Sequence, residues 1–67
     1  MSPAPRDFRL AGTWSTFRLE YSPGRQQPWT LWEKRVTDMQ SYVLCFAVTD
    51  KEAVHYASLR RGGFDGE

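Results

Sequence analysis

Residues 41–53 read SYVLCFAVTDKEA and join an apolar segment directly to the start of a helix. From Ser41 to Val48 both alternating sets of side chains are apolar, which is typical of a strand that is central in a sheet or covered on both faces. Thr49 and Glu52 then form a capping box, in which the Thr49 hydroxyl accepts the Glu52 amide and the Glu52 carboxylate accepts the Thr49 amide. The stretch therefore predicts a strand followed by a helix, and the glycine pair at 62–63 is expected to end that helix.

Two further strands are predicted before this segment. Residues 14–21 alternate, with Phe17, Leu19 and Tyr21 on one side. The residues on the other side are Trp14, Thr16, Arg18 and Glu20. Proline and glycine in the turn at 22–24 favour a reversal of the chain. The next β-rich segment, 29–36, follows closely enough to form an antiparallel hairpin with the first.

The order strand, strand, strand, helix predicts an α+β fold: a three-stranded antiparallel meander with one C-terminal helix packed on one face (βββα). We expect a flexible N-terminal arm over 1–12, the βββα domain over 13–62 and a disordered acidic tail over 63–67. The triplet at 8–10, Phe-Arg-Leu, recurs at 17–19. This repeat is compatible with a short extra strand, but we interpret it as chance. The predicted core is apolar and consists of Phe17, Leu19, Tyr21, Trp29, Leu31, Tyr42, Leu44, Phe46, Ala53, Val54 and Ala57.

A chain of 67 residues is one small domain, and its aromatic content of 15% supplies much of the apolar area that it can bury. Self-association would bury more, so a homodimer is a further expectation. A single cysteine excludes an internal disulfide, and one cysteine with one histidine cannot form a four-ligand zinc site. We expect no metal and no cofactor.

The sequence predicts a cytoplasmic protein with no membrane partner. Residues 1–7 contain no apolar run that could form the core of a signal peptide. No segment approaches the ~20 apolar residues that span a bilayer. A lone cysteine also fits a reducing compartment.

We predict that the chain is not an enzyme. A Cys45–His55 nucleophilic pair would need an orienting group, an oxyanion hole and a cleft, for which a chain of this size has little room. We interpret His55 as an exposed helical residue and Cys45 as a small apolar one.

The sheet face away from the helix is the candidate binding surface. Tryptophans, a valine and flanking cations form a surface that water solvates poorly, and such patches mark interaction sites. The candidate partner-binding residues are Trp14, Arg18, Trp32, Lys34, Val43 and Cys45. Two alternatives stay open: the arm covers Trp14 and Trp32 with Phe8 and Leu10, or the face is the seam of a homodimer.

The leading functional hypothesis is a non-catalytic protein-binding module, an adaptor or an inhibitor. The alternative is a nucleic-acid-binding domain in which tryptophans stack on single-stranded bases while Arg18 and Lys34 contact the backbone. The net charge of +1 is too small to indicate nucleic acid by itself, although residues 1–35 carry +3 and include all three tryptophans.

Residues 46–53, FAVTDKEA, resemble the last strand and helix start of the arm-type DNA-binding domain of phage tyrosine integrases. In that family a three-stranded sheet precedes a helix that begins with Thr-x-x-Glu-Ala, and the sheet enters the major groove. The resemblance implies a βββα fold and DNA binding, but the family's sheet is rich in lysine and arginine, which this sheet is not. The small size and the aromatic face also resemble phage- or prophage-encoded inhibitors of host proteins, including anti-CRISPR proteins.

Overall fold

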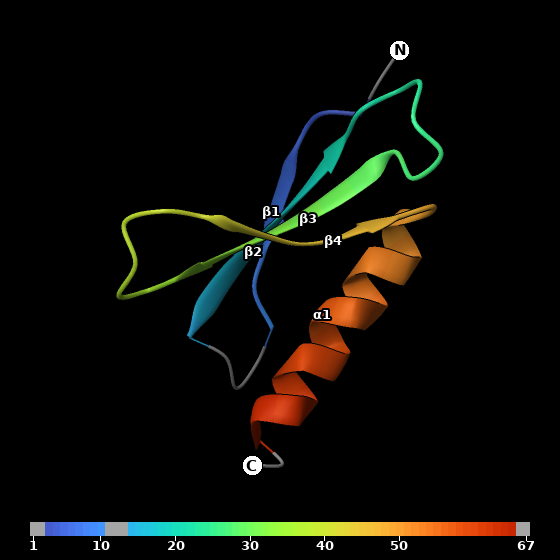
Figure 1. The fold of residues 1–67 in the computed structure, drawn as a ribbon. Helices are drawn as coiled ribbons and strands as arrows, with labels where there is room; N and C mark the ends of the chain where they lie inside the picture. The colour runs from blue at the N-terminus through green and yellow to red at the C-terminus, as the bar shows by residue number, and fades with distance from the viewer. Residues whose placement is uncertain (1–2, 11–13, 66–67) are drawn as a thin grey trace.

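A computed structural model describes residues 3–10 and 14–65, with side chains described as far as residue 59. The chain forms one antiparallel sheet of four strands, in the order β1-β2-β3-β4, followed by a C-terminal helix (Figure 1). The predicted α+β class, the antiparallel sheet and the single C-terminal helix are confirmed. The predicted number of strands is wrong, because the sheet has four strands and not three.

The central hairpin follows the predicted alternation. Strand β2 (Ser15–Tyr21) pairs along its whole length with β3 (Trp29–Arg35). Phe17 and Leu19 are buried against the helix, whereas Thr16 and Arg18, which alternate with them, are exposed. Gly24 adopts a φ of 89°, a conformation that favours glycine, so the predicted turn chemistry is confirmed.

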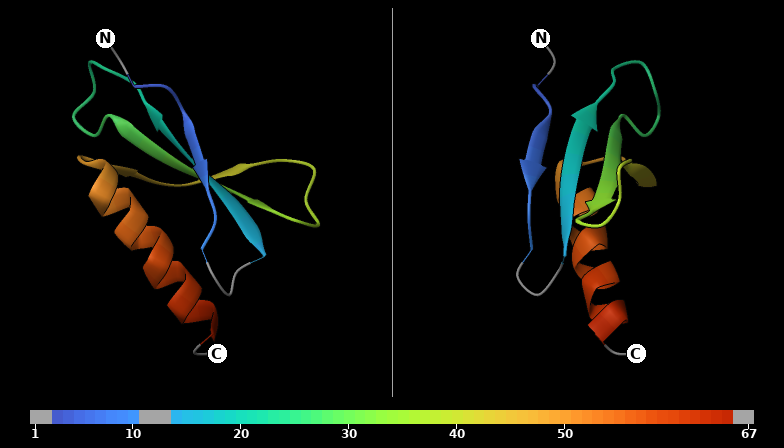
Figure 2. Two further views of the ribbon diagram at one scale, coloured as in Figure 1. Left: turned by 180° about the vertical axis from the view of Figure 1, so that it is seen from behind. Right: turned by 90° about the vertical axis from the view of Figure 1, so that its left-hand side faces the viewer.

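The additional strand lies in the predicted arm. Strand β1 (Arg6–Phe8) pairs antiparallel with β2 and forms one edge of the sheet (Figure 2). Phe8 lies opposite Phe17, and the two rings stack with their centroids 5.3 Å apart. Residues 6–8 are therefore part of the sheet rather than of a flexible arm. Residues 1–2 and 11–12 of the predicted arm lie outside the described residues.

Strand β4 (Tyr42–Ala47) contains a bulge that changes the face assignment of its second half. Leu31 lies opposite Cys45 and Trp32 lies opposite Val43, which leaves Leu44 as the extra residue on β4. Because one inserted residue reverses the alternation beyond it, Cys45 faces the helix side of the sheet and Phe46 faces away. Phe46 and Tyr42, both predicted in the core, are 49% and 56% exposed.

The bulge also explains why both sets of β4 side chains are apolar. This pattern predicts a strand that is central in the sheet or covered on both faces. Instead, β1 forms one edge of the sheet and β4 forms the other edge. Cys45 and Ala47 contribute apolar atoms to the helix side, and Val43 and Phe46 contribute them to the other side. The pattern reflects two alternations of opposite phase in one strand.

Helix α1 (Asp50–Asp65) is capped by Thr49, whose Oγ1 accepts the Glu52 amide at 3.1 Å. The second bond of the predicted capping box differs, since the Glu52 carboxylate accepts the Val48 amide at 3.2 Å rather than that of Thr49. The helix also continues through the glycines at 62–63, where we expected it to end. Glycine within a helix costs only about 1 kcal/mol relative to alanine, so this pair is not an obligatory stop. Residues 63–65 of the predicted tail are thus helical, and 66–67 lie outside the described residues.

The core lies between α1 and one face of the sheet. Small helix residues let α1 approach the strands closely, and both Ala53 and Ala57 are fully buried. The buried apolar residues are Phe17, Leu19, Leu31, Ala47, Ala53 and Ala57. In the described part of the chain, no helix has the length and apolar character that a membrane crossing requires.

Candidate protein-docking face

One face of the sheet packs on α1, and we name it the covered face; the opposite face is the open face (Figure 1). The strand register assigns residues to each face, because residues directly opposite each other on neighbouring strands point to the same side. Pairing of Arg18 with Trp32 and of Thr16 with Lys34 defines the centre of the open face. Its residues on the four strands are Asp7, Thr16, Arg18, Glu20, Thr30, Trp32, Lys34, Val43 and Phe46.

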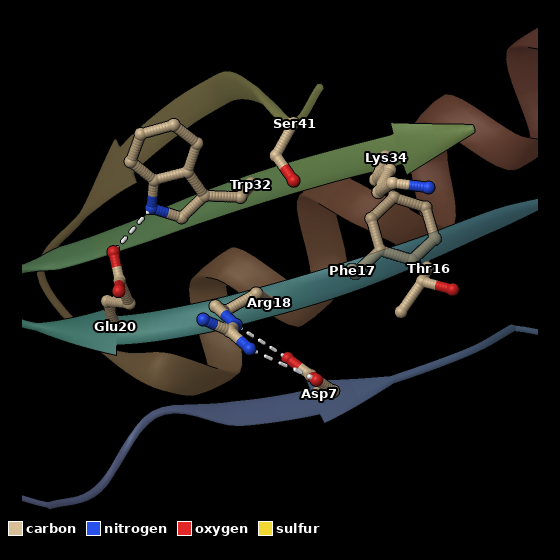
Figure 3. A pocket seen from close by; sticks show the side chains of 8 residues that line it. All are labelled: Asp7, Thr16, Phe17, Arg18, Glu20, Trp32, Lys34 and Ser41. Carbon is tan, nitrogen blue, oxygen red and sulfur yellow. Dashed lines mark hydrogen bonds and ion pairs between the residues drawn. The ribbon is translucent and has the colours of Figure 1, made fainter. Parts of the chain in front are cut away.

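A hollow of roughly 370 Å³ lies on the open face, within the range of small ligand-binding clefts. Strands β2 and β3 supply most of its lining, β1 supplies one side, and Ser41 lies where the chain enters β4 (Figure 3). The lining residues are Asp7, Thr16, Phe17, Arg18, Glu20, Trp32, Lys34 and Ser41. The hollow thus combines one indole ring with four ionisable side chains.

Trp32 is held in place by a cross-strand hydrogen bond. Its Nε1–H donates to Oε1 of Glu20 at 2.6 Å, and the ring is half-buried. The bond satisfies the polar atom of the indole and leaves part of the ring surface exposed to solvent. Trp32 therefore presents an apolar surface in a fixed orientation.

Arg18 is paired with Asp7 across β1 and β2. The Arg18 Nε–H donates to Oδ1 of Asp7 at 2.7 Å, and Nη2 donates to Oδ2 at 3.4 Å. The hydrogen bond from Arg18 lowers the pKa of Asp7, an effect that desolvation of the carboxyl partly opposes. The same bond raises the pKa of Arg18. Both side chains are about half exposed, so the pair orients Arg18 more than it stabilises the fold.

Lys34 is the remaining cation of the hollow. Its side chain is exposed, and within residues 3–10 and 14–59 it makes no hydrogen bond or ion pair. Since Arg18 is engaged by Asp7, Lys34 is the charged donor of the hollow that no described carboxylate engages.

A second apolar position lies at the β4 side of the open face. Phe46 is opposite Thr30 in the register, and the Arg25 guanidinium lies 5.0 Å from the centre of the Phe46 ring. Nη2 of Arg25 also donates to the Thr30 hydroxyl at 2.8 Å. The loop between β2 and β3 is therefore attached to the open face beside Phe46.

The structure brings three of the six predicted binding residues, Arg18, Trp32 and Lys34, together in the hollow. Val43 lies next to them, opposite Trp32. Trp14 is 78% exposed at the start of β2, outside the hollow, where its carbonyl accepts the Val36 amide at 2.9 Å.

Cys45 does not lie on the open face, which corrects its predicted position. The bulge turns its side chain to the covered face, where it packs against the core. Burial raises the pKa of the Cys45 thiol, and the Glu52 carboxylate adds to this effect. A raised pKa means less thiolate at neutral pH and hence a less reactive cysteine.

The alternative in which the arm covers the tryptophans is also wrong. Strand β1 lies beside β2, and Phe8 and Leu10 pack against the core rather than across the open face. Trp14 stays exposed, and the edge of Trp32 is covered by Glu20 of β2.

Asp7 and Phe46 are the residues of the open face that sequence reasoning missed. Asp7 belongs there only because β1 joins the sheet, and the repeated Phe-Arg-Leu triplet overlaps that strand only at Phe8. Phe46 belongs there only because of the bulge at Leu44.

Within the described residues, no group of three or more histidine, cysteine, aspartate or glutamate side chains could hold a metal ion. No family model matches the chain, and comparison with curated proteins and with solved structures gives no match either.

Proposed function

We propose that this chain is a non-catalytic protein-binding module that docks on a partner protein through its open face. The observation that carries the proposal is the hollow, in which an oriented indole ring lies beside an unengaged lysine. Tryptophan in a partly desolvated cleft is among the commonest hot spots of protein interfaces. A polar rim around such an anchor is also the usual anatomy of an interface.

Apolar contact area around the hollow supports the same proposal. Val43 lies opposite Trp32 and is 42% exposed, and Phe46 lies further along the same strand. Together these side chains extend the apolar surface from β3 to the edge of the sheet. Single exposed apolar residues are common on proteins, whereas a contiguous group favours an interaction site.

The charges of the hollow favour a partner segment that carries a carboxylate beside an apolar side chain. Asp7 and Glu20 already occupy Arg18 and the Trp32 N–H, so an incoming carboxylate finds Lys34 as its partner. The apolar neighbour of that carboxylate would pack on Trp32. A role as an adaptor or an inhibitor, and a cytoplasmic location, belong to this proposal.

Nucleic-acid binding is the second candidate, because Trp32 lies opposite Arg18 and shares the hollow with Lys34. Base stacking on an aromatic ring with cations nearby is the usual arrangement in single-strand binding. However, the formal charges of Asp7 and Glu20 cancel those of Arg18 and Lys34, and a polyanion needs a net positive surface. The open face therefore favours a protein partner.

Reversal of one charge tests the proposal. We expect Lys34→Glu to abolish capture of the partner from a lysate of the native host, with the captured proteins identified by mass spectrometry. Lys51→Glu is the matched control, since it makes the same charge change at an exposed position in the first turn of α1. Equal capture by both variants would exclude the hollow as the docking site. Circular dichroism of the two variants checks that both are folded.

Fluorescence polarisation with labelled single- and double-stranded DNA and RNA separates the two candidates. At low salt we expect either that the chain binds none of these nucleic acids or that any binding is as strong in Lys34→Glu as in the native chain. Binding that falls steeply as salt rises and is lost in Lys34→Glu would instead support the nucleic-acid alternative.

A further inference from the structure

The two edges of the sheet differ in how they discourage pairing with another strand. Strand β1 has three residues, of which Arg6 and Asp7 are charged, and two prolines lie at positions 3 and 5. Charges, prolines, shortness and bulges are the usual devices that protect an edge strand. Strand β4 has six residues, none of them charged, proline or glycine, and the bulge at Leu44 is the device that it carries. Of these two edges, β4 is therefore the less protected against pairing.

Exposed apolar side chains gather along this edge. Tyr42 is 56% exposed, Val43 42%, Phe46 49% and Val48 55%. They flank the strand on both sides: Tyr42 lies opposite Glu33 on the covered-face side, whereas Val43 and, because of the bulge, Phe46 lie on the open face. A strand placed beside β4 would cover apolar area on both faces of the sheet at once.

We propose that β4 pairs antiparallel with β4 of a second copy of this chain across a twofold axis. The main-chain N–H and C=O groups on the outer side of the strand would then be satisfied by an identical row. A second copy fits better than a charged partner strand, because β4 carries no charge that self-pairing would set against a like charge. The small core of the chain gives such pairing a further advantage, since short domains often gain buried surface by association.

The area available sets the expected strength. One aromatic ring buries ~150–250 Å², so the exposed halves of Tyr42 and Phe46 with Val43, Val48 and the strand backbone offer several hundred Å² on each chain. A standard interface buries about 800 Å² on each partner. We therefore expect a weak dimer, with a dissociation constant in the micromolar range.

The geometry of the dimer follows from the pairing. A twofold axis perpendicular to the sheet keeps both helices on one side and both open faces on the other. The product is an eight-stranded sheet in which β1 forms both outer edges. Two copies of the hollow would then lie on the same surface.

Sedimentation equilibrium of the full chain from about 1 µM to about 1 mM tests the proposal. We expect a concentration-dependent dimer, and Tyr42→Lys should raise its dissociation constant at least about tenfold, because lysine guards natural edge strands. Val36→Lys is the matched control, since Val36 is also an exposed apolar residue but lies outside β4, and it should leave the constant unchanged. Tyr42 and Val36 both lie outside the hollow, so failure of this experiment does not bear on the docking proposal.

Cross-linking locates the interface. p-Benzoylphenylalanine in place of Tyr42, in an equal mixture of labelled and unlabelled chains, should give mixed-isotope cross-links to residues 42–47 of the other copy. A chain that stays monomeric up to the highest concentration overturns the proposal. So does a dimer whose cross-links lie elsewhere, or a Tyr42→Lys variant that dimerises like the Val36→Lys variant.

Discussion

The covered and the open face of the sheet are made by the same strands but are held together in different ways. On the covered face Phe17, Leu19 and Leu31 are buried under α1, and their contribution comes from apolar area removed from water. On the open face the prominent contacts are cross-strand polar pairs, Arg18 with Asp7 and Trp32 with Glu20. The comparison shows that alternation along β2 and β3 supplies two chemically distinct surfaces, one apolar and buried under α1 and one polar and open to solvent.

The largest effect is expected on the covered face. Leu31 is fully buried, so Leu31→Ala should lower the free energy of unfolding by about 2–5 kcal/mol, through lost burial and the cavity that remains. Urea denaturation measures the loss. Val36→Ala removes exposed apolar atoms from the same hairpin and should change the stability by less than about 0.5 kcal/mol.

If Leu31→Ala is too unstable to fold, the smaller truncation Leu31→Val keeps the test decisive. A loss no greater than that of Val36→Ala would show that α1 does not bury this face.

A smaller effect is expected from the polar pair on the covered face. The Ser15 hydroxyl donates to Oε2 of Glu33 at 2.6 Å, and both side chains are buried. Hydrogen bonds to charged groups contribute about 1.5–3 kcal/mol, so Ser15→Ala should destabilise the fold by an amount of that order. Ser41→Ala, an exposed serine, is the control and should be nearly neutral in the same urea titration. Equal stability of the two variants would contradict the buried bond.

The smallest effect is expected on the open face, from the Arg18–Asp7 pair. The pKa of Asp7 is lower in the folded chain than its ordinary value of 3.8, chiefly because of the Arg18 hydrogen bond. The contribution of the pair is therefore fully present at pH values above 3.8 and is lost as the pH falls through the folded pKa. Asp7→Asn should be less stable than the native chain at neutral pH, and the difference should shrink in acid. A difference that stays constant or grows in acid would contradict the pairing.

Much of the fold can be predicted, because at many residues the local sequence pattern agrees with the position that the residue takes in the folded chain. Phe17 and Leu19 alternate with exposed residues, Gly24 marks the turn, and Thr49 caps the helix, as the sequence predicts. Strand β1 was missed because three residues with two charges form a strand only when β2 offers them a pairing edge. Pairing of this kind is tertiary and leaves little trace in local sequence.

In the candidate site, too, residues that follow the local pattern were predicted correctly and a residue displaced by tertiary structure was not. Arg18, Trp32 and Lys34 were placed on one face by period-two patterning, and they do line one hollow. Cys45 was placed on the wrong face because a single extra residue in β4 reverses the phase of the strand. A bulge between apolar residues has no polar residue to mark it, so the reversal cannot be read from the sequence.

The strands stand in the sheet in the order in which the chain is synthesised, and each pairs with its immediate successor. Every pairing step therefore closes only a short loop, which keeps the entropic cost of each step low. Contacts of α1 with β2 join more distant segments and are expected to form last. Pairing between strands that are neighbours in the sequence favours faster folding than non-local strand pairing in a domain of similar size. Little time would then pass with an unpaired apolar strand exposed to aggregation.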